Sequence, residues 1–155
     1  MVMKKLIIAL IAFLLVVGAS IFEIVYTTKS YDTLSELSAK VTASGSECVT
    51  YKKANELSIG LNGAEDEDAK RSLSLVAAAT KERIEALETR WKKYRFFTLS
   101  LGNHTVVKSI EERIATLKRQ WHTEQWEDLT VTSDALTAYF GGLRDDTHPS
   151  LPNLL

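Results

Sequence analysis

The chain has 155 residues, a formal net charge of −1 and 45% hydrophobic residues. This length allows one modest domain, and the balanced charge argues against nucleic acid as a partner. The single cysteine, Cys48, excludes a disulfide within the chain, and free cysteine usually behaves as a small hydrophobic residue.

The first predicted element is an apolar helix that is long enough to cross a membrane. Lys4 and Lys5 precede an uncharged run over residues 6–22, about 17 residues, which corresponds to ~26 Å of helix. Apolar residues resume after one acidic position and end at Tyr26. The two lysines favour a cytoplasmic N-terminus. We therefore expect residues 1–26 to anchor the chain in the cell membrane by a single pass, with the C-terminal domain extracytoplasmic.

A cleaved signal peptide is the alternative to this anchor. The two lysines would form its basic region, residues 6–16 its apolar region, and Val17-Gly18-Ala19 a small-residue cleavage site. Both interpretations export the domain, but cleavage near Ala19 would leave it secreted. The apolar run continues past Ala19 to Phe22, which favours the uncleaved anchor.

Residues 27–65 are predicted to form a helical stalk and a connecting segment. Leucine and valine side chains from Leu34 to Val41 continue helical spacing directly from the anchor. Ser44-Gly45-Ser46 is expected to interrupt this helix, and Asn62-Gly63 to mark a second break. The stretch 47–59 between the two breaks is either a short helix or a loop.

Residues 66–147 are predicted to form a helical bundle, because three apolar stripes recur there at steps of three and four residues. The first helix covers residues 66–97, with acidic residues at its start and basic residues near its end. The second begins near Thr105 and ends at His122-Thr123, and the third begins at about Glu124 and ends at Gly141-Gly142. The stripes are Leu73, Ala77, Thr80, Ile84, Leu87, Trp91 and Tyr94; Val107, Ile110, Ile114, Leu117 and Trp121; and Trp126, Leu129, Leu136, Phe140 and Leu143.

The expected fold is therefore all-α, with an N-terminal transmembrane helix followed by a small antiparallel bundle of three to four helices. Short connections make consecutive helices antiparallel neighbours, and Gly102-Asn103 supplies one such break. Residues 148–155 contain Pro149 and Pro152, so an extended tail is expected there.

Four cations, Arg90, Lys92, Lys93 and Arg95, alternate with aromatic residues near the end of the first bundle helix. They could bind an anionic lipid surface or an acidic cell-wall polymer. The structural interpretation is that Trp91 and Tyr94 belong to the core stripe and that the cations complete a helix C-terminus.

The sequence contains no recognisable catalytic or metal-binding pattern. His104, His122 and His148 lie at no spacing typical of metal ligands. No serine-nucleophile motif is present either. We therefore expect no enzymatic activity, no cofactor and no metal.

The chain resembles a family of short bacterial proteins whose domain has no assigned function. The likeness rests on the dilysine start with its apolar run, and on weak motifs from about Arg83 onward: Trp91 with Phe97, Asn103-His104, Ile110-Glu111, Leu117, Leu136 and the ending Leu151 to Leu155. The resemblance implies a membrane-attached protein of unassigned role, with a multi-pass membrane protein as a possible partner. It carries over no site residues.

Two functional hypotheses follow. The first is a membrane-tethered extracytoplasmic interaction or scaffold module, because an anchor and amphipathic helices occur without reactive groups. The second is an exported binding protein for a small ligand, or for an anionic wall or lipid surface, using the basic and aromatic run.

Overall fold

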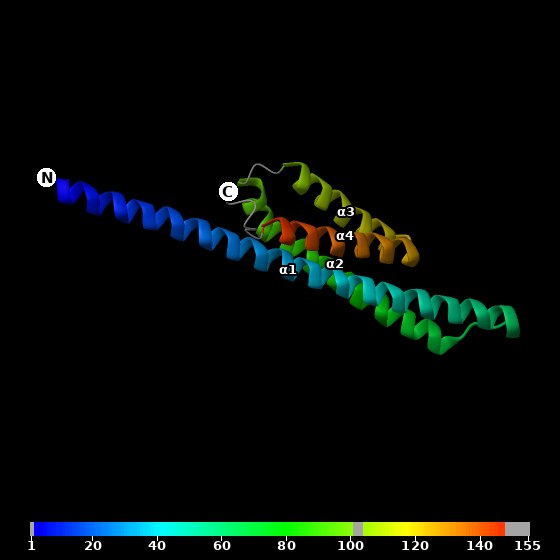
Figure 1. Ribbon diagram of the computed structural model, residues 1–155. Helices are drawn as coiled ribbons and strands as arrows, with labels where there is room; N and C mark the ends of the chain where they lie inside the picture. Colours follow the sequence, from blue (N-terminus) through cyan, green and yellow to red (C-terminus); the bar gives the residue numbers. More distant parts are fainter. Residues whose placement is uncertain (1, 101–103, 148–155) are drawn as a thin grey trace.

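The structure is a computed structural model that describes residues 2–100 and 104–147. This part of the chain contains four helices and no strand: α1 (Val2–Asn62), α2 (Glu67–Ser100), α3 (His104–His122) and α4 (Trp126–Thr147). Consecutive helices run antiparallel, and α4 closes the ring against α1 (Figure 1). The predicted all-α fold with an antiparallel helical bundle is confirmed. The expected break at Gly102-Asn103 and the expected tail at residues 148–155 lie outside the described residues.

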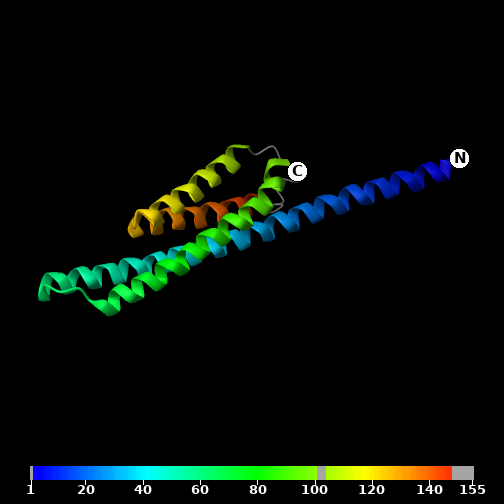
Figure 2. The same ribbon diagram turned by 180° about the vertical axis from the view of Figure 1, so that it is seen from behind.

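Helix α1 is continuous over 61 residues and is therefore about 92 Å long. Its N-terminal part projects beyond the other described helices, and its C-terminal part is one of the four helices of the bundle (Figures 1 and 2). Leu34, Val41 and Cys48 are fully buried in the common core. Residues 27–65 were expected to be a stalk and a connecting segment, but most of this segment is a wall of the bundle itself.

The predicted helix break at Ser44-Gly45-Ser46 is wrong. The hydroxyls of Ser44 and Ser46 donate hydrogen bonds to carbonyl oxygens one turn earlier in α1, at 3.1 and 3.0 Å. Gly45 faces α4 so closely that a Cβ atom there would lie 2.8 Å from side-chain carbons of both Leu129 and Thr130. This glycine therefore permits a close contact between two helices and does not end one.

The predicted break at Asn62-Gly63 is confirmed, and the undecided stretch 47–59 is helical. Gly63 has a φ of 67° and donates its N–H to the carbonyl oxygen of Ile59 at 2.9 Å, which is an αL helix cap. The next helix starts after Asp66, whose carboxylate accepts the N–H of Ala69 at 3.0 Å.

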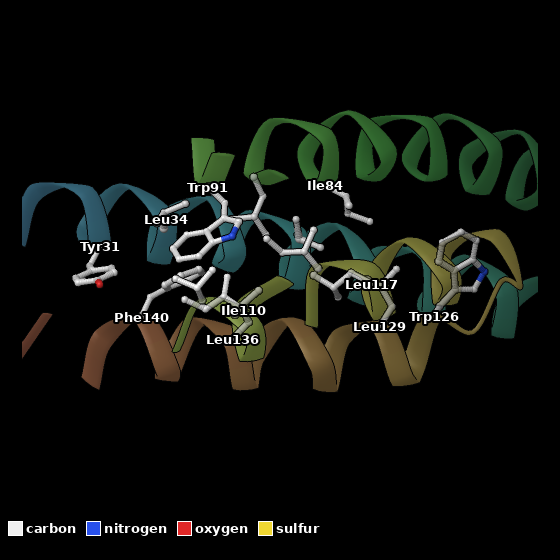
Figure 3. Close-up of a cluster of buried hydrophobic side chains, with 14 of the residues drawn as sticks. Tyr31, Leu34, Ile84, Trp91, Ile110, Leu117, Trp126, Leu129, Leu136 and Phe140 are labelled. Carbon is white, nitrogen blue, oxygen red and sulfur yellow. The ribbon is translucent and has the colours of Figure 1, made fainter. Parts of the chain in front are cut away.

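The core contains the predicted stripes. From α2, Thr80, Ile84, Leu87 and Trp91 are buried, and the other stripe residues of this helix are partly buried at its edge. The stripes of α3 and α4 are buried in the same way, except that Trp121 and Leu143 are partly buried: the buried members are Val107, Ile110, Ile114, Leu117, Trp126, Leu129, Leu136 and Phe140. Figure 3 shows Tyr31, Trp91 and Phe140 converging from α1, α2 and α4. The centroid of the Phe140 ring lies 6.5 Å from that of Tyr31 and 6.4 Å from that of Trp91.

The turn between α3 and α4 differs from the prediction in one residue. α3 ends at His122 as expected, but Glu124 does not lie in the first turn of α4. It adopts a φ of 54° and donates its N–H to the carbonyl oxygen of Trp121 at 3.2 Å, while the N–H of Gln125 reaches the carbonyl oxygen of Gln120 at 2.9 Å. This pair of hydrogen bonds is a Schellman motif with glutamate in the position that usually holds glycine.

The prediction that α4 ends at Gly141-Gly142 is also wrong, because the helix continues to Thr147. Packing holds this last part: Leu143 is partly buried against the core, and Arg144 forms an ion pair with Asp32 of α1 at 3.3 Å. Tertiary contacts therefore outweigh the low helix propensity of two glycines, about 1 kcal/mol each.

Candidate functional site: the apolar segment and the adjoining end of the bundle

The N-terminal part of α1 carries a large apolar surface that nothing in the described chain covers. Side chains from Leu6 to Val25 are exposed almost throughout, with Leu15 at 69% and Phe22 at 65% of full exposure. Among the described residues, α1 is the one helix that is long and apolar enough to cross a membrane. A signal sequence has the same properties, so the segment meets the length and composition criteria of either a membrane anchor or a signal sequence.

Aromatic side chains join this segment to the bundle. The Phe22 and Tyr26 rings stack at 6.0 Å, and Tyr26 meets the Tyr94 ring of α2 edge-on at 5.7 Å. Slightly further along α1, the Tyr31 hydroxyl lies 3.3 Å from the Thr98 hydroxyl. The C-terminal end of α2 therefore lies beside the point where the exposed apolar run ends (Figure 1).

Two of the four predicted surface-binding cations are engaged in ion pairs. Lys92 pairs with Glu88 at 2.8 Å, and Arg95 pairs with Glu111 of α3 at 2.8 Å. Lys118 of α3 also reaches Glu88, at 2.9 Å. Hydrogen bonds from Lys92 and Lys118 lower the pKa of Glu88 below its ordinary value. Lys92 and Arg95 thus belong to a network of charges between α2 and α3.

The other two cations, Arg90 and Lys93, are exposed and form no ion pair with the described part of the chain. Phe96, three residues after Lys93, is also exposed, at 70%. The expectation that all four cations complete a helix end is wrong, because α2 continues to Ser100 and its last turn contains no basic residue. Sequence reasoning grouped the four cations, whereas the structure separates them into two kinds.

A cavity of about 360 Å³ lies at the opposite end of the bundle, between α1 and the turn that joins α3 to α4. Its lining combines Lys52 and Lys53 with several acidic residues, and Lys53 pairs with one of them, Glu127, at 2.7 Å. The indole N–H of Trp126, which also lines it, has no partner among the described residues. Sequence reasoning missed this cavity, since only the close approach of the turn to α1 creates it.

The remaining reactive groups do not assemble into a site. His104 and His122 are exposed at the two ends of α3, and His148 lies outside the described residues. Within residues 2–100 and 104–147, no group of three or more His, Cys, Asp or Glu side chains is arranged to hold a metal ion. The Cys48 thiol is buried, with its sulfur 3.8 Å from the Thr80 hydroxyl, and burial raises its pKa.

Comparison with known proteins found no match, either among protein-family models, among curated proteins or among solved structures. The resemblance to a family of short bacterial proteins therefore stays a prediction.

Proposed function

We propose that this chain is a membrane-tethered interaction module, in which the apolar part of α1 spans the membrane and the four-helix bundle presents the binding surfaces. The observation that carries the proposal is the continuity of α1. The same helix exposes its apolar side chains over residues 6–25 and buries Leu34, Val41 and Cys48 in the core. Leaving such side chains in water costs about 1.5–3 kcal/mol each, so a surface of this size needs an apolar environment.

The proposed orientation has the N-terminus in the cytoplasm and the bundle outside. Lys4 and Lys5 support it, because basic residues beside a span favour the cytoplasmic face. A reporter enzyme that is active only in the cytoplasm, fused after Leu155, should then be inactive. An active fusion would reverse the orientation.

The proposed role is binding and not catalysis, and the proposed partner is a protein of the same membrane. The continuous helix α1 supports this choice of partner, because it joins the span to the bundle without a flexible linker. The bundle therefore stays next to the bilayer, where a protein of the same membrane can reach it. The resemblance to a family of short bacterial proteins implies that this partner is a multi-pass membrane protein.

Membrane retention tests the proposal directly. The uncleaved protein should stay in the membrane fraction through high-salt and carbonate washes, and its intact mass should include residues 1–19. Cleavage after Ala19 would instead release a chain that starts at Ser20. That chain would still contain every residue of the described core, since the first of them is Tyr31, so release would favour a secreted binding protein over a tethered module.

A second candidate function is binding of an anionic wall polymer or lipid surface by the exposed cations of α2. Arg90 and Lys93 favour this function, because they are exposed and form no ion pair with the described residues. Replacing both by glutamate should reduce association with isolated wall material if this function is correct. The matched control replaces Lys52 and Arg71, which are exposed toward the other end of the bundle, and should leave the association unchanged.

A further inference from the structure

We propose that the end of the bundle beside the apolar segment is a lipid-contact surface, in which Phe96 enters the headgroup layer and Lys93 binds the phosphate of anionic lipids. This inference rests on the proposed anchoring role of α1. It adds a second contact with the bilayer, made by α2, which has no apolar span of its own.

The apolar span is slightly shorter than the hydrocarbon layer that it would cross. The uncharged run over residues 6–22 is about 17 residues, or ~26 Å, and the hydrocarbon layer is about 30 Å thick. A span that is slightly short draws the residues after it toward the bilayer. In α1 these residues already belong to the bundle: Glu23 and Ile24 are partly buried, and Thr27 is buried. Because α1 has no break there, the bundle must follow the span to the membrane surface.

The C-terminal part of α2 contacts α1 just beyond the end of the span. Tyr26, which contacts the Tyr94 ring, is four residues beyond Phe22, a rise of about 6 Å. Each headgroup layer is about 5–8 Å thick, so this contact lies at the level of the headgroups. Phe96 is two residues beyond Tyr94 in α2, at most about 3 Å along the helix axis, so it lies at about the same level.

The surface of α2 at this end combines an aromatic ring with a cation. Phe96 is 70% exposed, and Lys93 lies one turn before it, so the two share a side of α2. Lys93 forms no ion pair with the described residues, unlike the neighbouring Lys92 and Arg95. An exposed aromatic ring with an adjacent cation is the composition of segments that lie in a membrane interface. The proximity of the span favours lipid over a protein as the partner of this surface.

Depth measurement on the full-length protein in vesicles tests the inference. A nitroxide label is attached to Phe96→Cys and, as a matched control, to Leu75→Cys, which is 66% exposed near the distant end of the same helix. The native Cys48 is buried, and labelling of the unchanged protein measures its background. In vesicles of phosphatidylcholine with phosphatidylglycerol, the label at position 96 should be more accessible to oxygen than to a water-soluble nickel complex. The label at position 75 should show the reverse.

Two outcomes separate this inference from the anchoring proposal. If the protein stays in the vesicles through a carbonate wash but position 96 is as accessible to nickel as position 75, the lipid contact is wrong and the anchor stands. If the protein washes off, the anchoring proposal fails first.

The role of charge is tested in the same system. Adding Lys93→Gln to the variant labelled at position 96 should shift its accessibility toward nickel in vesicles that contain phosphatidylglycerol. The same change at Lys52, which is exposed at the far end of the bundle, should have no effect. Equal depth at position 96 with and without Lys93 would overturn its assignment as the phosphate ligand.

Discussion

Ser38 of α1 and Ser133 of α4 each donate a hydroxyl hydrogen bond to the backbone carbonyl oxygen of the other residue, at 2.8 Å in both directions. Both side chains are fully buried, and their hydroxyl oxygens are 3.3 Å apart. The exchange satisfies two polar groups inside an apolar core and lets the two helices approach closely. It lies two turns from Gly45, so small residues line this part of the α1–α4 contact.

Removing either hydroxyl of this pair should weaken the bundle. We expect Ser38→Ala and Ser133→Ala each to lower the free energy of unfolding by about 1 kcal/mol, because a buried hydrogen bond is lost. The double variant should cost less than the sum, since the two residues interact. Denaturant unfolding in detergent, followed by tryptophan fluorescence, measures this change because all three tryptophans lie in the bundle. Ser46→Ala, at an exposed position of α1, is the control and should change stability by less than about 0.5 kcal/mol.

Two glycines of α1 should respond in opposite directions to alanine. Gly45→Ala places a Cβ atom 2.8 Å from Leu129 and Thr130, and overpacking of about 1–3 kcal/mol should exceed the gain in helix propensity. Gly60 has no neighbouring atom within 4 Å, so Gly60→Ala should stabilise the helix by about 0.5–1 kcal/mol. Thermal unfolding of both variants measures the difference. Stabilisation by Gly45→Ala would contradict the close α1–α4 contact.

The left-handed backbone at Glu124 predicts a stabilising substitution. Glycine adopts a φ of 54° without the steric cost that glutamate bears, so Glu124→Gly should raise the free energy of unfolding by about 1 kcal/mol. Gly63→Ala makes the opposite change at a φ of 67° and should lower it by about 1 kcal/mol. Denaturant titration of the pair checks both signs, and a loss of stability in Glu124→Gly would argue against the Schellman turn.

Burial of Cys48 predicts a pH dependence of stability. Burial raises the pKa of its thiol in the folded state above the ordinary value of 9.0, so the folded protein holds this proton more tightly than the unfolded chain does. The thiol's contribution is complete below pH 9.0 and should be lost as the pH rises through the raised pKa. Unfolding curves at increasing pH should show a smaller loss for Cys48→Ala than for the unchanged chain. A thiol reagent at neutral pH should also react slowly until denaturant is added.

Deleting residues 1–22 should leave a soluble bundle. All buried core residues lie beyond this segment, and the exposed apolar side chains are mostly within it. Circular dichroism should show a helical fragment with a cooperative thermal transition. An unfolded fragment would mean that the span or a partner is needed for folding, and a dominant β signal would contradict the fold.

Local patterns of the sequence were sufficient for much of this fold. The apolar stripes predicted which faces of the helices are buried, because a side chain every three or four residues lies on one side of a helix. A glycine correctly predicted a helix end where the backbone conformation itself requires glycine, as at Gly63, whose φ is positive. For the candidate site, the sequence singled out four cations in the C-terminal part of α2. It could not separate Arg90 and Lys93 from the two cations whose acidic partners lie on a neighbouring helix turn or on α3.

The sequence by itself determined the all-α class, the apolar N-terminal helix and the buried faces of α2, α3 and α4. Only the tertiary structure decided that α1 continues through Gly45, that α4 continues through Gly141-Gly142, and that most of residues 27–65 belongs to the bundle. The physical reason is the scale of the two effects. A glycine lowers helix stability by about 1 kcal/mol, whereas burial of one large side chain between helices contributes about 1.5–3 kcal/mol. Contacts between segments far apart in the chain therefore decide where the helices end, and no local pattern contains them.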